Sequence, residues 1–256
     1  MTEPEPTSEH LYERIAGALR DEILARTRVP GERLPTQEEL GETFGASRIA
    51  VRRALDLLES EGLIDRVQGG RATVRLYDPL VRRSALHYRT NPGMPFAEEA
   101  LKTERTPTYD YDTAPERAGL EVARRLNVEV GTEVMRTTYL SYANGEPIQR
   151  VTSYEPLALT RGTPIEHPEQ GPLMAAGIVD RFTSIGLRPT NVTERLHARM
   201  PRPSEAEQLH LRPGIPVIVA VRTCYAGELP IETADLLFAA NQFKLEYSLT
   251  VEPEAT

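Results

Sequence analysis

Apolar residues at spacings of three and four predict three helices in the first quarter of the chain. The buried faces expected for these helices are Leu11, Ile15, Leu19 and Ile23 in the first, Leu40 and Phe44 in the second, and Val51, Ala54, Leu55 and Leu58 in the third. The turn signal Pro30-Gly31 separates the first helix from the second. This pattern predicts a small helical domain.

Polar residues mark where the second and third helices begin and end. Thr36 followed by Glu39 is a capping box, in which each side chain can bond the other residue's backbone amide. Gly45 breaks the second helix, and Ser47 is a good N-cap for the third. Gly62 is the C-cap expected after the last turn. The two helices are therefore joined by a tight turn.

A short hairpin with Gly69-Gly70 at its tip follows the third helix, so residues 10–75 read as a winged helix-turn-helix. Such a module inserts the N-terminal end of its last helix into the major groove, where Arg48 and Arg52 lie one turn apart. Arg53 points further toward solvent. The residues predicted to contact DNA are Thr36, Ser47, Arg48, Arg52, Gln68, Gly69 and Arg71.

The charge distribution agrees with a DNA-reading module on an acidic body. The formal net charge is −8, but residues 10–75 carry 11 arginines and 11 acidic residues, and residues 47–75 carry six arginines against four. Residues 1–9 form an acidic, Pro-rich tail without the pattern of a signal peptide. With a single cysteine, Cys224, expected in a strand core, this predicts a cytoplasmic protein.

The rest of the chain alternates between strand and helix patterns. Residues 76–95 read as a linker, in which Arg82 and Arg83 are expected to be solvated or to touch phosphate. Strands are expected at 109–113, 133–142, 147–154, 190–200, 217–225 and 230–238, and helices at 115–126, 173–185 and 203–210. Asn144-Gly145 is a strong hairpin turn. The pattern predicts an α+β domain over 96–252, built on antiparallel strands.

The first domain resembles the GntR family of bacterial regulators. The resemblance rests on four motifs in order, LYERIA at 11–16 with PGERLPT at 30–36, FGASR at 44–48, VRRAL at 51–55 and EGLI at 61–64. It implies that Ser47, Arg48, Arg52 and Gly69 occupy DNA-contacting positions. Glu38, Ala50 and the wing sequence Gly69-Gly70-Arg71 depart from the family pattern, which leaves the operator sequence open.

The second domain resembles the effector-binding UTRA domain of the HutC branch of that family. Its motifs are NGEP at 144–147, SYEP at 153–156, AEQL at 206–209 with PGIPV at 213–217, and GELPIE at 227–232. The resemblance implies a chorismate-lyase-like fold that senses a small molecule. Tyr139 and Ser141 stand where sugar-phosphate sensors carry paired arginines, so a phosphosugar is disfavoured against an uncharged or aromatic effector. The predicted effector-binding residues are Tyr139, Ser141, Tyr154 and Glu232.

No catalytic or metal pattern accompanies these motifs, because the five histidines are scattered and no phosphate loop or nucleophile elbow occurs. We therefore expect no cofactor. From the two domains together we expect a homodimeric repressor that binds a palindromic operator and is released by an effector. Two alternatives remain: a plasmid-type regulator whose second domain only dimerises, and a chorismate-lyase-like enzyme with an appended DNA module.

Overall fold

The computed structural model describes residues 8–66, 70–75, 79–88, 95–174 and 176–248. The chain divides into two compact units, an N-terminal unit of residues 1–78 with Arg212–Ile215 and a C-terminal unit of residues 79–211 and 216–256. Within the described ranges, no helix combines the length and the apolar character needed to cross a membrane.

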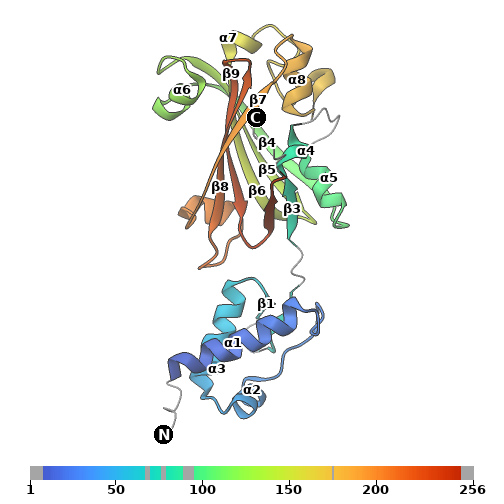
Figure 1. The fold of residues 1–256 in the computed structure, drawn as a ribbon, viewed down its shortest axis with the longest axis vertical. Helices are drawn as coiled ribbons and strands as arrows, with labels where there is room; N and C mark the ends of the chain where they lie inside the picture. Colours follow the sequence, from blue (N-terminus) through green and yellow to red (C-terminus); the bar gives the residue numbers. More distant parts are fainter. Residues whose placement is uncertain (1–7, 67–69, 76–78, 89–94, 175, 249–256) are drawn as a thin grey trace, which may run out of the picture. The chain divides into compact units, whose positions relative to one another are not determined.

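The N-terminal unit consists of three helices and a short hairpin (Figure 1). Its elements are α1 (Ser8–Leu24), α2 (Gln37–Phe44), α3 (Arg48–Ser60), β1 (Ile64–Asp65) and β2 (Thr73–Val74). The strands β1 and β2 are antiparallel, with Ile64 opposite Val74, and a bridge from Arg33 to Thr73 adds a third chain segment. The predicted order of helices and hairpin is present.

One apolar core holds the three helices and the hairpin together. Ile15, Leu34 and Leu58 are fully buried in it, together with Val51 and Ile64. Apart from Leu11, the residues of the predicted stripes meet in this core, because a spacing of three and four brings them to one face of each helix. Truncating a fully buried leucine of this kind costs about 2–5 kcal/mol, so this core decides whether the unit folds.

The C-terminal unit is built on one large antiparallel sheet. Its elements are β3 (Leu80–Arg83), α4 (Ser84–His87), α5 (Pro95–Leu101), β4 (Pro107–Arg117), α6 (Leu120–Leu126), β5 (Glu133–Ala143), β6 (Glu146–Pro156), α7 (Leu157–Thr160), η1 (Gly171–Leu173), α8 (Ile178–Ser184), β7 (Asn191–Arg199), α9 (Pro203–Gln208), β8 (Val217–Ala226), β9 (Leu229–Ala239) and β10 (Phe243–Glu246). The strand order in the sheet is β4-β5-β6-β9-β8-β7, and β3 and β10 form a separate parallel pair.

The turn between β5 and β6 has the conformation that its sequence predicts. Asn144 and Gly145 have φ values of 53° and 79°. Both central residues of a type I′ turn need positive φ, which Asn and Gly tolerate better than other residues. The turn places Tyr139 opposite Val151 and Ser141 opposite Gln149. This register aligns alternate residues of both strands on one face of the sheet.

Different elements cover the two faces of the sheet, as Figure 1 shows for α6 on one side and for α4, α5 and β3 on the other. Helix α6 packs through Ala123 and Leu126 against Val134 and Tyr154. On the opposite face, Leu80 of β3 and Phe96 of α5 join an apolar cluster with residues of β6, β8 and β9. The space enclosed on this second face holds the cavity discussed below.

The structure differs from the sequence prediction in several segments, and α4, α5, α7 and β10 are elements that the pattern does not predict. Strand β4 continues through Pro115 to Arg117, so the helix expected at 115–126 begins only at Leu120. An edge strand accommodates proline because one side of it needs no amide donor. The helix expected at 173–185 is divided into η1 and α8, with Gly177 capping the second piece. Residues 80–83 of the predicted linker form β3.

Candidate DNA interface and effector cavity

The turn between α2 and α3 is held by hydrogen bonds of the capping residues. The Thr36 amide donates to Glu39 Oε2 at 2.6 Å, and the Glu39 amide donates to Thr36 Oγ1 at 3.2 Å, which completes the predicted capping box. Gly45 ends α2 with φ of 60°. Ser47 then caps α3, accepting a hydrogen bond from the Ala50 amide at 3.3 Å. These bonds fix where α3 begins relative to α2.

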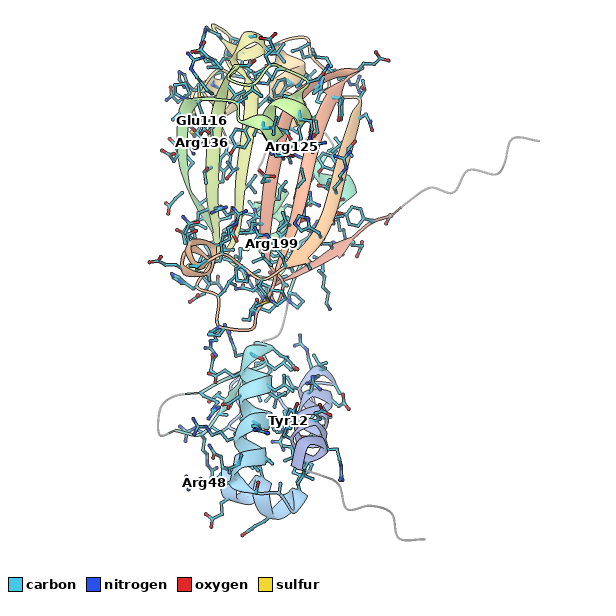
Figure 2. The ribbon with its side chains drawn as sticks, turned by 90° about the vertical axis from the view of Figure 1, so that its left-hand side faces the viewer. Tyr12, Arg48, Glu116, Arg125, Arg136 and Arg199 are labelled. Atoms are coloured by element: carbon cyan, nitrogen blue, oxygen red, sulfur yellow. The ribbon has the colours of Figure 1, made fainter. Side chains whose placement is uncertain are left out.

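Helix α3 presents its arginines on the side away from the core. Arg48, Arg52 and Arg53 are all exposed, whereas Ala50 and Val51 between the first two are buried. Figure 2 labels Arg48 at the N-terminal end of α3. Across the described ranges, none of the three arginines forms an ion pair. Their guanidinium groups are therefore available to an external partner such as a phosphate or a guanine edge.

A surface groove adjoins the start of α3. It is lined by residues of the turn before α2, of α3 and of the hairpin, namely Thr36, Gln37, Arg48, Arg66, Gly70 and Arg71 among others. Arg71 is exposed and reaches Glu39 with 3.5 Å between Nη2 and Oε1, while Arg66 pairs with Asp56. Of the residues predicted to contact DNA, Gln68 and Gly69 lie outside the described residues. The other five surround this groove or the start of α3.

The C-terminal unit contains a cavity of about 140 Å³ between the sheet and the elements that cover it. Its lining mixes apolar and charged side chains from six or more elements. The lining residues used below are Arg82, His87, Phe96, Tyr139, Ser141, Val151, Ser153, Glu155, Glu169, Arg181, Arg222, Glu232 and Leu236. Taking roughly 10–15 Å³ per water centre, the cavity has room for about ten waters or a small organic molecule.

Three of the four predicted effector residues line this cavity. Tyr139, Ser141 and Glu232 are among its walls, and Ser141 accepts a hydrogen bond from Gln149 Nε2 at 3.2 Å. Tyr154 lies on the opposite face of the sheet, where it packs against α6. Because side chains alternate along a strand, its neighbours Ser153 and Glu155 face the cavity instead.

Three arginines, none of them predicted as effector residues, form ion pairs in the cavity wall; Arg82 and Arg181 are buried and Arg222 is largely buried. Arg181 donates to both oxygens of Glu155 at 2.7 and 2.9 Å, and also to the Ile165 carbonyl at 3.1 Å. Arg222 donates to both oxygens of Glu232 at 3.3 and 2.5 Å. Bidentate pairs of this kind are the strong, geometrically specific form of the arginine–carboxylate contact.

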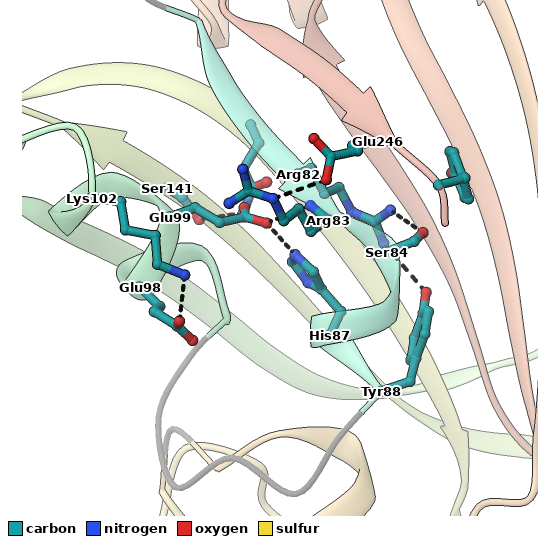
Figure 3. Close-up of polar contacts among 12 residues, drawn as sticks. Arg82, Arg83, Ser84, His87, Tyr88, Glu98, Glu99, Lys102, Ser141 and Glu246 are labelled. Carbon is teal, nitrogen blue, oxygen red and sulfur yellow. Dashed lines mark hydrogen bonds and ion pairs between the residues drawn. The ribbon is translucent and has the colours of Figure 1, made fainter. Parts of the chain in front are cut away.

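The third arginine, Arg82, corrects the expectation of a solvated linker residue, because its side chain is 1% exposed. It donates to both Glu194 oxygens, at 2.5 and 3.2 Å, and to the hydroxyl groups of Ser84 and Tyr88 at 3.3 Å each. Figure 3 shows Ser84 and Tyr88 bonded to Arg82, with the nearby pair of His87 and Glu99. Strand β3 thus belongs to the cavity wall.

We expect the free energy of unfolding of the C-terminal unit to depend on pH through the Glu194 carboxyl. Burial by itself would raise the pKa of Glu194, but the hydrogen bonds and charge of Arg82 and the Tyr88 hydroxyl outweigh it and lower the pKa to about 2, from 4.5. This carboxylate therefore stabilises the folded unit above pH 4.5, and the contribution declines as the pH falls toward 2. Acid titration of the unfolding free energy should show a shallower decline in Glu194→Gln than in the natural chain. Glu121→Gln, at an exposed pair with Arg124, should leave the slope unchanged; equal slopes for all three proteins would contradict the assignment.

The single cysteine is inert in this structure. Cys224 is 0% exposed and lies in an apolar cluster with Phe182 and Ile231. Burial, followed by the charge of Glu232, raises its pKa well above the usual value. The thiolate is the reactive form of cysteine, so the thiol stays unreactive while the domain is folded. Among the described residues, no group of three histidine, cysteine or carboxylate side chains is placed to hold a metal ion.

One signal in the sequence pointed to part of this wall. Arg222 is the one charged residue in the strand predicted at 217–225, and Glu232 lies in the facing strand of the same predicted hairpin, so a pair between them would offset the cost of burying either charge. The partners of Arg82 and Arg181 could not be found this way, because Glu194 lies 112 residues and Glu155 26 residues away from them. Ion pairs across such distances depend on the strand order.

Comparisons with known proteins agree with this architecture. The family model "Bacterial regulatory proteins, gntR family" matches residues 11–74, and the UTRA domain model matches residues 105–244. An uncharacterized HTH-type transcriptional regulator of Streptomyces coelicolor is 27% identical over 95% of this chain and 94% of its own length. The histidine utilization repressor of Pseudomonas putida is 27% identical over 92% and 90%.

Two solved structures share the fold over almost the whole chain. A crystal structure assigned to a GntR-family transcriptional regulator has a TM-score of 0.68 and 33% identity, covering 96% of this chain and all of that chain. PhnF from Mycobacterium smegmatis has a TM-score of 0.59 and 17% identity, covering 93% and 100%. The chain therefore belongs to the GntR family of bacterial transcriptional regulators, in the HutC-like branch that joins a winged helix-turn-helix to a UTRA domain.

Proposed function

We propose that the protein is a ligand-responsive repressor that acts in the cytoplasm, binds a palindromic operator as a homodimer and leaves it when a small molecule occupies the cavity of the UTRA domain. The observation that carries the proposal is the exposed, ion-pair-free state of Arg48 and Arg52 at the start of α3, within the described residues. Arginines without a carboxylate partner can bond guanine or phosphate without first breaking a contact.

The geometry around α3 supports a role for its first turn in phosphate binding. A helix N-terminus offers backbone amides and a favourable dipole to an anion. Ser47 is exposed there and its hydroxyl can donate to a phosphate while its oxygen caps the helix. Arg71 has one ion pair among the described residues, the 3.5 Å contact with Glu39. We infer that its guanidinium contacts the phosphate backbone of DNA bound at the groove. Two such modules related by a two-fold axis would read two half-sites.

The cavity favours a C-terminal domain that binds an effector over one that serves only for dimerisation. Its volume of about 140 Å³ is lined by several polar side chains, an arrangement typical of a binding site rather than of a filled core. An effector releases the repressor only if it binds the DNA-free dimer geometry more tightly than the DNA-bound one. A domain that serves only for dimerisation has no use for such a lining.

Operator binding is tested with full-length protein and the DNA upstream of its own gene and of its neighbours. We expect fluorescence anisotropy to detect one DNA site that binds two chains. A footprinting experiment should show two protected half-sites about 10 base pairs apart, or a multiple of that spacing. With 6–10 phosphate contacts, affinity should fall about 10³–10⁵-fold between 50 and 200 mM salt. Equal binding to a shuffled sequence, or one chain per site, would contradict the proposal.

A further inference from the structure

Among the described residues, the charged groups of the cavity wall are paired, with one exception. Each arginine in the wall has its own bidentate carboxylate: Glu194 for Arg82, Glu155 for Arg181 and Glu232 for Arg222. His87, on the α4 side, contacts the Glu99 carboxylate at 2.7 Å. Every one of these carboxylates has a nitrogen base as its partner. An anionic ligand would have to displace one of them and leave it buried without a cation.

The exception is Glu169, a cavity residue that is 5% exposed. Its carboxylate accepts a hydrogen bond from the Tyr109 hydroxyl at 2.9 Å, and Tyr139 also lies against it. No lysine, arginine or histidine of the described residues pairs with it. Two neutral hydroxyl groups solvate a buried carboxylate only in part, so Glu169 keeps a carboxylate that no described residue neutralises.

The two tyrosines stay protonated beside this carboxylate. Burial, with the hydrogen bond and charge of Glu169, raises the pKa of Tyr109 to about 12, and burial and the charge of Glu169 also raise the pKa of Tyr139. Both therefore remain neutral donors at physiological pH. The rings of Tyr109 and Tyr139 lie 6.2 Å apart, and an aromatic face near a carboxylate is a favourable surface for a cation.

We propose that the effector carries a positively charged amine, with Glu169 as its counter-ion and Tyr139 as its aromatic neighbour. The apolar walls Phe96, Val151 and Leu236 would accept a small hydrocarbon or aromatic body attached to that amine. The proposal rests on the proposed effector site and narrows its ligand to cationic amines. Each of the three arginines in the wall is already paired with a carboxylate, so none of them is free to bind a phosphate.

The test uses three probes with the same body and different charge, namely phenethylamine, 2-phenylethanol and phenylacetate. Isothermal titration calorimetry on the full-length protein without DNA should show binding about 10–100-fold tighter for the amine than for the alcohol, the range expected for a hydrogen-bonded charge. Phenylacetate should bind weakest. Equal binding of alcohol and amine, or tightest binding of phenylacetate, would overturn the proposal.

A second arm needs no ligand. Glu169→Gln removes the unneutralised charge and should raise the melting temperature of the ligand-free protein, whereas Glu155→Gln removes the partner of Arg181 and should lower it. Glu133→Gln, at an exposed pair with Arg161, serves as the control and should change neither the melting temperature nor amine binding. A lower melting temperature for Glu169→Gln would overturn the proposal even if no probe binds.

The same samples separate this proposal from the proposed function. Operator binding by the natural chain is measured with and without the amine, and the control Glu133→Gln should match the natural chain in both measurements. If the amine binds through Glu169 but leaves operator affinity unchanged, effector-controlled release fails while the ligand class stands. If another molecule releases the operator and the amine preference is absent, the ligand class fails while the repressor function stands.

Discussion

Removing the Glu155 carboxylate should destabilise the C-terminal unit by about 3–5 kcal/mol, because Glu155→Ala leaves the buried Arg181 guanidinium without its partner. The side chains of the pair are 8% and 2% exposed, so the guanidinium left behind is shielded from bulk solvent. Hydrogen exchange of the amides in β5 and β6 measures the free energy of unfolding of this unit directly, which avoids fitting a two-domain chain to one transition.

The reason for the loss can be separated from a simple loss of packing. In the double variant Glu155→Leu with Arg181→Met, both charges are replaced by apolar groups, and we expect more than half of the stability lost in Glu155→Leu alone to return. The control is Glu133→Ala, which breaks an exposed pair with Arg161 and should cost less than about 1 kcal/mol. A loss for Glu155→Ala as small as the control's would show that the buried pair contributes little.

Replacing Arg48 or Arg52 by alanine should weaken operator binding by about 1–3 kcal/mol each at fixed salt. Both are exposed at the start of α3, and the folded unit should tolerate the change because neither side chain packs into the core. Fluorescence anisotropy with the operator and with a shuffled duplex separates the two kinds of contact. A base contact lowers affinity for the operator alone, whereas a phosphate contact lowers both affinities and reduces the salt slope by about one.

The matched control is Arg53→Ala on the same helix. Arg53 follows Arg52 directly and is also exposed, but lies about 100° around the helix from it. Its replacement removes the same charge from the same helix, so any general electrostatic effect appears in all three variants. If Arg48→Ala and Arg52→Ala bind the operator as tightly as Arg53→Ala, α3 is not the helix that reads the groove.

The local patterns of the N-terminal unit were sufficient to predict its fold. Capping residues such as Thr36 and Ser47 act on amides three residues away, and the apolar stripes act within a helix. The same holds for the Asn144-Gly145 hairpin. The family resemblance added the expected fold of the C-terminal domain.

The cavity wall depended on information that local patterns do not contain. The structure places Tyr154 on the face opposite the cavity, and the sequence does not determine which alternate residues of a strand point inward, because a shift of one residue exchanges the faces. The burial of Arg82 is not predictable from local sequence, because β3 is short and its partner strand β10 is distant in the sequence. Glu169 lies in a loop whose sequence carries no periodic pattern.

The buried Cys224 makes the natural chain a convenient host for chemical labels. It is the only cysteine, and its enclosed thiol should not react with a maleimide while the protein is folded. A cysteine introduced at an exposed position such as Arg53 would then be the single reactive site on each chain. Spin labels attached there would report the distance between the two α3 helices of the proposed dimer, with and without a ligand.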